Sequence, residues 1–416
     1  MSSAQELSLS IEPEDDAHPA QVHDELPGVL REAAPPARHG ELISRLARSR
    51  YAVSADTEIY ALASAMDHLP AVHAVGVVDH EGTAIGLVTR QHLFDHLGKM
   101  YGRDLYKRKA VAELVTEARI FRDDLSTTTV AEMLRKDLRR MEDTWYLLAD
   151  AAGKFRGVFS SKDLLIYLSE LTARDIALAR RLQTAIVHEQ FAMMEKRFEL
   201  SCISRMAREV GGDFYIAREL DQHRLLVGLC DVSGKGIAAS LVTAVLGGIF
   251  NTFTAATSLR AFLRSLNGYI FETFQLEYFV TGAFVELDLV TGQATMCDMG
   301  HSYVLVSRGD TLLRAPSRAL NPPLGVARDI TPILSAYTLG AGDLAVLFTD
   351  GVVEQRNKAG EEYSEKRLWK MLRGNASLPV GALAEALTAD VATYRGEQPQ
   401  GDDLTCVLLR YCGSSE

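Results

Sequence analysis

Two kinds of hydrophobic pattern divide this chain. From about Glu41 onward, short apolar runs alternate with helical stretches, which is typical of small α/β units. Strand-like apolar runs separated by turns dominate later, above all from Phe279 to Asp350. Between these regions, Ser169 to Leu200 contains neither Pro nor Gly and predicts a long connecting helix. Because compact domains hold roughly 100–200 residues, the 416-residue chain is expected to form two folded domains.

The beginning of the chain differs from the rest. Residues 1–40 combine acidic side chains with five prolines and lack apolar periodicity, so they are predicted to be a flexible tail. They also lack the basic start and apolar run of a secretory signal. The longest apolar stretch, Ile237 to Phe250, is too short to cross a membrane. A cytoplasmic protein with no membrane partner is expected, divided into residues 1–40, 41–171, 172–200 and 201–416.

The predicted connecting helix carries an apolar stripe. Leu171, Leu178 and Ala185 recur at seven-residue spacing, and Leu182 lies on the same stripe. Such a stripe packs either on its own chain or on a second copy in a coiled coil. A homodimer is therefore one hypothesis for this chain.

Composition excludes some classes of function. Hydrophobic residues at 47% and charged residues at 24% are ordinary for a soluble protein. The five cysteines show no CxxC pairing, which disfavours a structural zinc site or a disulfide framework. A net charge of −11 gives no general attraction for a polyanion, so nucleic acid is not expected as a partner.

Two segments of the first domain have the same pattern. Ala74–Phe94 and Thr144–Leu165 each read as strand, Asp/Gly turn, strand and helix, which indicates an internal duplication. The region from roughly Ile43 to Leu171 resembles the paired cystathionine-β-synthase (CBS) regulatory modules. That resemblance implies an α/β module that binds an adenine nucleotide between its repeats.

The nucleotide would be held by a Ser/Thr-x-x-Asp turn. The second repeat provides Ser160 and Asp163, whereas the first has Thr89 and His92, with histidine where the CBS family has aspartate. One nucleotide site is therefore expected. The alternative is structural, because Ser160 and Asp163 also suit the capped start of a helix.

Four aspartates lie beside glycines at the ends of apolar strands. They are Asp213 in GGDFY, Asp231 in DVSGKG, Asp350 in TDGVVE and Asp402 in GDDLT. Hard cations such as Mg²⁺ and Mn²⁺ prefer oxygen ligands, and carboxylates from several strand ends can surround them. Two such ions can hold a phosphate and lower the pKa of water. A single aspartate in such a place is more often a turn residue, so the joint pattern carries the prediction.

The order of these motifs closely resembles the SpoIIE-like bacterial branch of the PPM metal-dependent phosphatases, over roughly Leu200 to Tyr411. The resemblance implies an overall α+β chain whose second domain is an αββα sandwich of two antiparallel sheets flanked by helices. Four segments would supply these helices: Gly236–Phe250, Ser258–Phe274, Glu365–Leu372 and Val380–Tyr394.

Carried over by position, the resemblance assigns roles to individual residues. Asp231 would bridge two Mn²⁺ or Mg²⁺ ions, and Asp213 would act directly or through bound water. The remaining assignments are metal ligands at Asp350, Asp402 and the Val232 carbonyl, with support from Asp403, Gly212 and Gly234.

Three further residues near these motifs have assigned or open roles. Ser233 stands where eukaryotic members often have a proton-donating His, so the general acid is left open. His301 is expected to be a structural turn residue. Lys235 either attracts a substrate phosphate or is a solvated lysine at a helix start.

The expected function is that of a metal-dependent protein serine/threonine phosphatase regulated by its N-terminal pair. Its substrate would be a phosphoprotein, for which similar bacterial proteins suggest a STAS-domain anti-anti-sigma factor. The alternative is a catalytically inactive, nucleotide-sensing module that binds a phosphoprotein. Four retained aspartates favour the enzyme, because an inactive scaffold has no chemical need for such a dense negative cluster.

Overall fold

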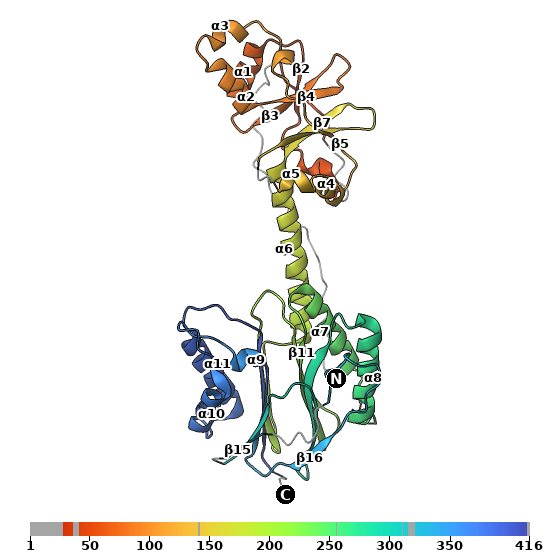
Figure 1. Ribbon diagram of the computed structural model, residues 1–416, viewed down its shortest axis with the longest axis vertical. Coiled ribbons are helices and arrows are strands. Elements are labelled where there is room, and N and C mark those ends of the chain that lie inside the picture. The colour runs from red at the N-terminus through yellow and green to blue at the C-terminus, as the bar shows by residue number, and fades with distance from the viewer. Residues whose placement is uncertain are drawn as a thin grey trace, which may run out of the picture. The chain divides into compact units, whose positions relative to one another are not determined.

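The computed structural model describes residues 28–35, 41–139, 142–254, 256–309, 311–314 and 321–413. The chain divides into two compact units, Met1–Leu171 and Thr172–Glu416. Figure 1 shows the elements of each unit, which are described separately below.

The N-terminal unit repeats one arrangement twice. The first copy consists of β2 (Tyr51–Ser54), α1 (Ile59–Asp67), β3 (Ala74–Val78), β4 (Ala84–Thr89) and α2 (Arg90–Leu97). The second consists of β5 (Ile120–Arg122), α4 (Thr127–Met133), β6 (Trp145–Ala149), β7 (Phe155–Ser160) and the start of α6 (Ser161–Ile186). In each copy the first two strands pair in parallel and the last two antiparallel. The predicted duplication is present in the fold.

Short elements connect these copies. The elements between the copies are α3 (Gly102–Tyr106) and the 3-10 helix Val111–Leu114, whereas the 3-10 helix Ile43–Leu46 precedes the first copy and α5 (Arg135–Leu138) lies within the second. The two hairpin turns also pair with each other: the Ala84 amide donates to the Gly153 carbonyl at 3.2 Å, and the Phe155 amide donates to the Gly82 carbonyl at 3.1 Å. Both glycines have φ +81°, a conformation that a side chain would strain.

Part of the predicted tail is ordered, so that prediction was wrong for residues 28–35. The strand β1 (Arg31–Glu32) pairs with the edge of β2, and Leu30 is only 5% exposed in the core. An apolar side chain and two strand pairs outweigh the polar composition of the segment. The rest of the predicted tail, residues 1–27 and 36–40, lies outside the described residues.

The connecting helix differs from the prediction at both ends. It begins at Ser161, directly after β7, and ends at Ile186 rather than Leu200. The residues after it form β8 (Gln190–Met194), which pairs with β9 (Phe198–Arg205). No Pro or Gly stops the helix. Instead, the alternate residues of β8 are part-buried, and Phe191 and Met193 pack against the core of the C-terminal unit, so tertiary pairing decides the boundary.

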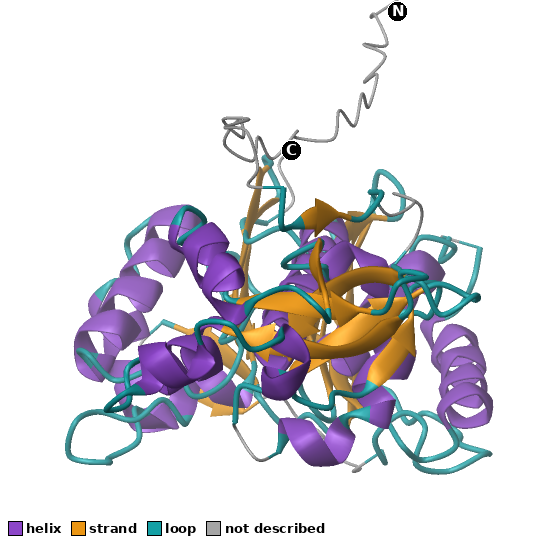
Figure 2. Ribbon diagram, turned by 90° about the horizontal axis from the view of Figure 1, so that it is seen from above, coloured by secondary structure: helices purple, strands orange, loops and turns teal. Residues whose placement is uncertain are grey.

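The C-terminal unit consists of two antiparallel sheets with helices outside them. The five-stranded sheet contains, in spatial order, β10 (Asp213–Glu219), β11 (Arg224–Val232), β12 (Val280–Asp288), β13 (Gln293–Met299) and β16 (Ser335–Thr338). The order in the six-stranded sheet is β15 (Thr311–Arg314), β14 (Val304–Arg308), β17 (Leu344–Phe348), β18 (Leu404–Tyr411), β9 and β8. Figure 2 distinguishes the helices, in purple, from the strands, in orange.

Among the described residues of this unit, five helices form the outer layers. The helices α7 (Ile237–Phe250) and α8 (Leu259–Phe274) lie on one side, and α9 (Asp350–Val353), α10 (Ser364–Gly374) and α11 (Val380–Arg395) lie on the other (Figure 1). The helices predicted from the family resemblance are confirmed to within two residues at each end. None of the described helices is long and apolar enough to cross a membrane.

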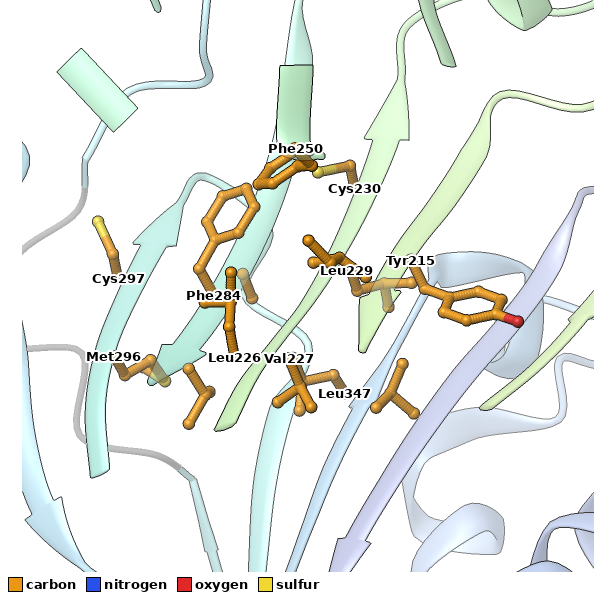
Figure 3. Packing of buried hydrophobic residues seen from close by; sticks show 14 of the residues in the cluster. Tyr215, Leu226, Val227, Leu229, Cys230, Phe250, Phe284, Met296, Cys297 and Leu347 are labelled. Atoms are coloured by element: carbon orange, nitrogen blue, oxygen red, sulfur yellow. The ribbon is translucent and has the colours of Figure 1, made fainter. Parts of the chain in front are cut away.

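The main core of this unit lies between the sheets and beneath α7 and α8. Phe250 of α7 stacks on Phe284 of β12 with ring centroids 5.5 Å apart, and both rings are fully buried beside Cys230 (Figure 3). Burying one such side chain contributes roughly 1.5–3 kcal/mol. A second cluster joins α10 and α11 to the outer face of the six-stranded sheet. Packing on both faces holds the strand ends in fixed positions.

Candidate active site

Strand register brings the first two predicted site residues together. Asp213 at the start of β10 lies opposite Asp231 near the end of β11, and Asp231 in turn lies opposite Thr281 of β12. The Val232 amide donates to the Gly212 carbonyl at 3.2 Å, which continues the pairing past Asp213. One end of the five-stranded sheet therefore carries two carboxylates side by side.

The other sheet supplies the remaining carboxylates. Asp350 follows β17, and Asp402 and Asp403 precede its partner strand β18. The Thr349 hydroxyl donates to Asp213 Oδ2 at 2.9 Å, which links the two sheets directly. The carboxylates of GGDFY, DVSGKG, TDGVVE and GDDLT are thus brought into one region by both sheets.

The carboxylates of this region raise one another's pKa. Burial raises the pKa of Asp213 well above its ordinary range, with Asp231 and Asp403 adding to the effect. Burial, followed by the charges of Asp350 and Asp402, raises the pKa of Asp231 to about 7. The pKa of Asp350 is also raised by burial and by Asp402. Negative charge is therefore concentrated here without enough positive charge to balance it.

Asp403 holds backbone in place. Its carboxylate accepts hydrogen bonds from the Ala207 and Gly212 amides, each at 2.7 Å. A Cβ on Gly211 would lie 2.4 Å from Asp403 Oδ2, so only glycine allows this approach. These contacts suit the supporting role that was predicted for Asp403 and Gly212, since they fix the backbone that leads into Asp213.

Lys235 is the cation that contacts the cluster. Its Nζ lies 2.6 Å from Asp402 Oδ2, and its charge lowers the pKa of Asp231 against the raising effects. The loop turns sharply at Gly234 and Gly236, whose φ angles are +91° and +83°. The Lys235 side chain is 47% exposed, so this contact leaves both interpretations of Lys235 open.

The residues present fit a hard cation by chemistry, although they are not gathered around one point. In the described ranges, no three His, Cys, Asp or Glu side chains converge as a preformed metal site. Each carboxylate instead contacts another partner. Asp402 pairs with Lys235, Asp403 accepts hydrogen bonds from backbone amides, and Asp213 accepts one from the Thr349 hydroxyl. Oxygen donors and unbalanced charge are what Mg²⁺ or Mn²⁺ requires. The ligand assignments stay predictions.

Sequence reasoning missed Gln183. This side chain of α6 is 2% exposed. Its amide N–H donates to the Gly211 carbonyl at 2.7 Å, and its amide oxygen accepts from the Gly211 N–H at 3.0 Å. It also donates to the Thr243 hydroxyl of α7 at 3.0 Å. A lone polar residue in a helical pattern gives no signal of such contacts. Gln183 fixes the backbone two residues before Asp213.

Thr349 was missed for a similar reason. Its hydroxyl accepts from the Thr405 amide at 3.0 Å while it donates to Asp213, so it satisfies two buried groups at once. In the sequence it is only the residue before Asp350. The interaction depends on two sheets meeting, which the sequence pattern does not show.

Two other predicted residues are held by backbone contacts. Buried His301 bonds the Phe348 carbonyl through Nε2 at 2.8 Å, and burial lowers its pKa, as expected for a structural turn residue. Ser233 accepts from the Phe279 amide and donates its own amide to the Phe279 carbonyl, both at 2.9 Å. Ser233 therefore joins the loop to β12.

The predicted nucleotide residues lie in the N-terminal unit. Asp163 Oδ2 accepts from the Ser160 amide at 2.9 Å and from its hydroxyl at 3.0 Å, while the Asp163 amide donates to Ser160 Oγ at 3.2 Å. This is the reciprocal bonding of a helix cap. The geometry is that of the structural alternative, and nucleotide binding stays a proposal.

The C-terminal unit has the fold of a solved PP2C domain. The fold is similar to that of the SiaA-PP2C domain of Pseudomonas aeruginosa, with a TM-score of 0.50 and 23% identity over 59% of this chain and 98% of that one.

Residues 221–411 match the family described as Stage II sporulation protein E (SpoIIE). Relatives include two proteins of Bacillus subtilis (strain 168). The chain is 22% identical to the phosphoserine phosphatase RsbP over 57% of its own length and 58% of RsbP. It is 25% identical to the phosphoserine phosphatase RsbU over 40% of its own length and 50% of RsbU. The chain thus spans 58% of the length of RsbP and 50% of that of RsbU.

Proposed function

We propose that this chain is a metal-dependent protein serine/threonine phosphatase that acts in bacterial signalling. The observation that carries the proposal is the group of aspartates that both sheets place in one region, where burial and mutual repulsion raise the pKa of three of them. Asp213, Asp231, Asp350 and Asp402 would hold Mn²⁺ or Mg²⁺, two ions per domain, with the Val232 carbonyl as a further ligand.

The two ions, when bound, would lower the pKa of water and balance the charge of the phosphate. The chain's own residues would prepare this centre. Asp231 lies between the carboxylates of both sheets, while Asp403 and Gln183 fix the backbone that leads into Asp213. Lys235, once it moves off Asp402, would be placed to bind a phosphate oxygen. Water would attack the phosphoester directly, without a phosphoenzyme.

The first test is phosphate release from phosphoserine peptides across a manganese titration, with wild-type protein and Asp231→Asn. Activity should depend on metal and fall by at least about 100-fold in the variant. The matched control is Asp221→Asn, because Asp221 only accepts from the His223 amide in an exposed turn and binds Arg224. The control should keep full activity.

Two results would contradict the proposal. Equal activity in Asp231→Asn and wild type would place the chemistry elsewhere. Binding of the phosphopeptide without hydrolysis at any metal concentration would favour the alternative, a phosphoprotein-binding module that is catalytically inactive.

The N-terminal unit and α6 are proposed to regulate this centre. An adenine nucleotide at the CBS-like pair, or pairing of two copies through α6, would change metal affinity if it favours one of two states. Leu178 and Leu182 of the predicted stripe are 49% and 59% exposed, which leaves them free for a homodimer. Calorimetry with AMP and ATP tests nucleotide binding, and the absence of a binding heat would contradict it. Light scattering at micromolar concentration tests the homodimer, and a monomeric mass would contradict it.

The substrate is proposed to be a phosphorylated protein of the STAS-domain anti-anti-sigma type. This rests on the resemblance of the motifs and on the phosphoserine phosphatases among the relatives. Comparing phosphate release from such a phosphoprotein and from a short phosphoserine peptide tests it. A kcat/KM no higher for the protein would argue against this substrate class.

A further inference from the structure

A cavity of about 370 Å³ lies in the C-terminal unit beside the acidic cluster but outside it. Its walls come from α11, the end of β9 and the residues before β18, and six of its lining residues are Arg205, Gln355, Thr388, Arg395, Gln400 and Leu404. A neighbouring cavity of about 320 Å³ includes Asp402 and Glu354, and the two share Gln355. The Gln398–Asp402 segment therefore borders both cavities, with Gln400 lining this one and Asp402 lining its neighbour.

The cavity contains a cation that lacks a partner. Arg395 Nε is buried from solvent and has no hydrogen-bond acceptor among the residues that the structure describes. Arg205, in contrast, bonds Glu189 at 2.9 Å, and Arg367 binds Asp390. Arg395 thus lines the cavity with a guanidinium that has no acidic partner among the described residues.

The other walls restrict what could bind there. The Gln400 amide already donates to the carbonyls of Arg205 and Asp402, and the Gln355 amide to those of Arg356 and Pro399. No acidic side chain lines this cavity within the described ranges. The occupant must therefore supply an acceptor for a guanidinium, and a carboxylate does so with two parallel hydrogen bonds.

The apolar lining favours an acid on a short carbon stem. Val391, Ala392 and Leu404 provide surface for such a stem. The opposite applies to the neighbouring cavity, where Glu354 and Asp402 repel an acid. Charge and shape together distinguish the two sides of the Gln398–Asp402 segment.

We propose that this cavity is a docking subsite for a Glu or Asp side chain of the phosphoprotein substrate. The inference rests on the proposed function, and it adds a sequence preference: a carboxylate at a fixed distance from the phosphoserine. Arg395 acts as a specificity residue that contacts substrate away from the reacting phosphate. Because Gln400 bonds the Asp402 carbonyl, occupancy of the cavity also steadies the segment that carries a predicted metal ligand.

The test uses the full chain and a set of fluorescent phosphoserine peptides. Each peptide carries one Glu at a different position, and each has a matched peptide with Gln. Dissociation constants from fluorescence anisotropy need no turnover, so they remain informative if the proposed hydrolysis fails. For wild type, one Glu position should bind about tenfold tighter than its Gln partner.

Variants then assign the preference to Arg395. Arg395→Met should remove the Glu preference. Arg395→Lys should retain part of it, because the positive charge stays while the paired N–H donors of the guanidinium are lost. Arg208→Met is the matched control, since Arg208 is exposed on the same unit and does not line the cavity. With active enzyme, the loss in Arg395→Met should appear in KM for the Glu peptide and not in kcat.

Three results would overturn the docking proposal. Glu and Gln peptides that bind equally at every position would exclude a carboxylate preference. An equal loss of p-nitrophenyl phosphate turnover in Arg395→Met and Arg395→Lys would show that Arg395 only supports the fold. The third result is that free glutarate binds to wild type and not to Arg395→Met, while the peptides show no preference for Glu. That result would identify a site for small anions instead.

Discussion

Aspartates at the turns of the N-terminal unit and at the strand ends of the C-terminal unit look alike in the sequence but differ in electrostatics. Asp79 and Asp150 each accept two backbone amides in their own hairpin turns at 2.8–2.9 Å, and these bonds lower the pKa of both. Burial and neighbouring carboxylates instead raise the pKa of Asp213 and Asp231.

The difference separates two uses of one residue type. A turn aspartate is stabilised by donors from its own few residues, so its charge is already satisfied. When a strand-end aspartate lies near other carboxylates from two sheets, its ionised form is destabilised. A bound cation would stabilise that ionised form. Both kinds of aspartate have glycines nearby in the sequence. Only the hydrogen-bond and charge partners of the carboxylate distinguish one kind from the other.

The largest expected effect is a dependence of stability on pH. The pKa of Asp231 is about 7 in the folded chain against an ordinary 3.8. Well below pH 3.8 the carboxyl group is protonated in both states, and as pH rises through 3.8 the unfolded state loses its proton first. Metal-free protein should therefore lose roughly 2–3 kcal/mol of unfolding free energy between pH 5 and pH 8.

Denaturation in EDTA measures this effect, with Trp369 of α10 as the reporter in a Trp145→Phe background. Asp231→Asn should flatten the pH dependence and stabilise the metal-free C-terminal unit at pH 8. Asp221→Asn, whose charge is satisfied in its turn, should leave the dependence in place. Identical slopes for Asp231→Asn and wild type would refute the assigned repulsion.

A second change removes a donor from a buried carboxylate. Thr349→Val deletes the hydroxyl that bonds Asp213 and should lower the unfolding free energy of the C-terminal unit by about 1–3 kcal/mol. It should also weaken manganese binding in calorimetry, because the pKa of Asp213 rises further. Thr393→Val is the control, since Thr393 bonds only the Ala389 carbonyl within an exposed helix turn. Unchanged stability would mean that Asp213 does not depend on this hydroxyl.

A third change removes the cation that contacts the cluster. Lys235→Met should raise manganese affinity about fivefold, because the metal no longer displaces an ammonium from Asp402. Calorimetry at low ionic strength is the measurement, and Lys366→Met on α10 is the control. Weaker metal binding in the variant would show that Lys235 assists the metal instead of competing with it.

The smallest effect is expected in the N-terminal unit. Asp150→Ala removes an acceptor for two turn amides and should lower the midpoint temperature of that unit by a few degrees, followed by fluorescence of Trp145. Asp150→Asn keeps a carbonyl acceptor and should behave like wild type. Phosphate release should be unchanged in both, and a loss of activity would break the contrast between the two kinds of aspartate.

Local pattern was enough to predict much of the fold. The duplicated strand–turn–strand–helix order and the four helices of the sandwich follow from periodicity and motif resemblance, and the structure confirms them. The strand at residues 31–32 and the end of α6 at Ile186 could not be predicted in this way. Both are decided by pairing with a strand elsewhere in the chain, and no local residue marks them.

The site shows the same division. Asp213, Asp231, Asp350 and Asp402 could be found because each ends or begins an apolar strand beside glycine. Gln183 and Thr349 could not, because their importance comes from contacts with Gly211 and Asp213, which are far away in the sequence. The capping of Ser160 by Asp163 was one of two open alternatives, and only the contacts distinguish them.

The sequence by itself determined the class of elements, the duplication and the candidate carboxylates, because these depend on residue type and local spacing. Tertiary structure alone decided which carboxylates repel one another, which residues fix them and where an arginine is left without an acceptor. Those properties depend on burial and on distances across two sheets. Charge becomes costly only when the fold removes water and brings like groups together.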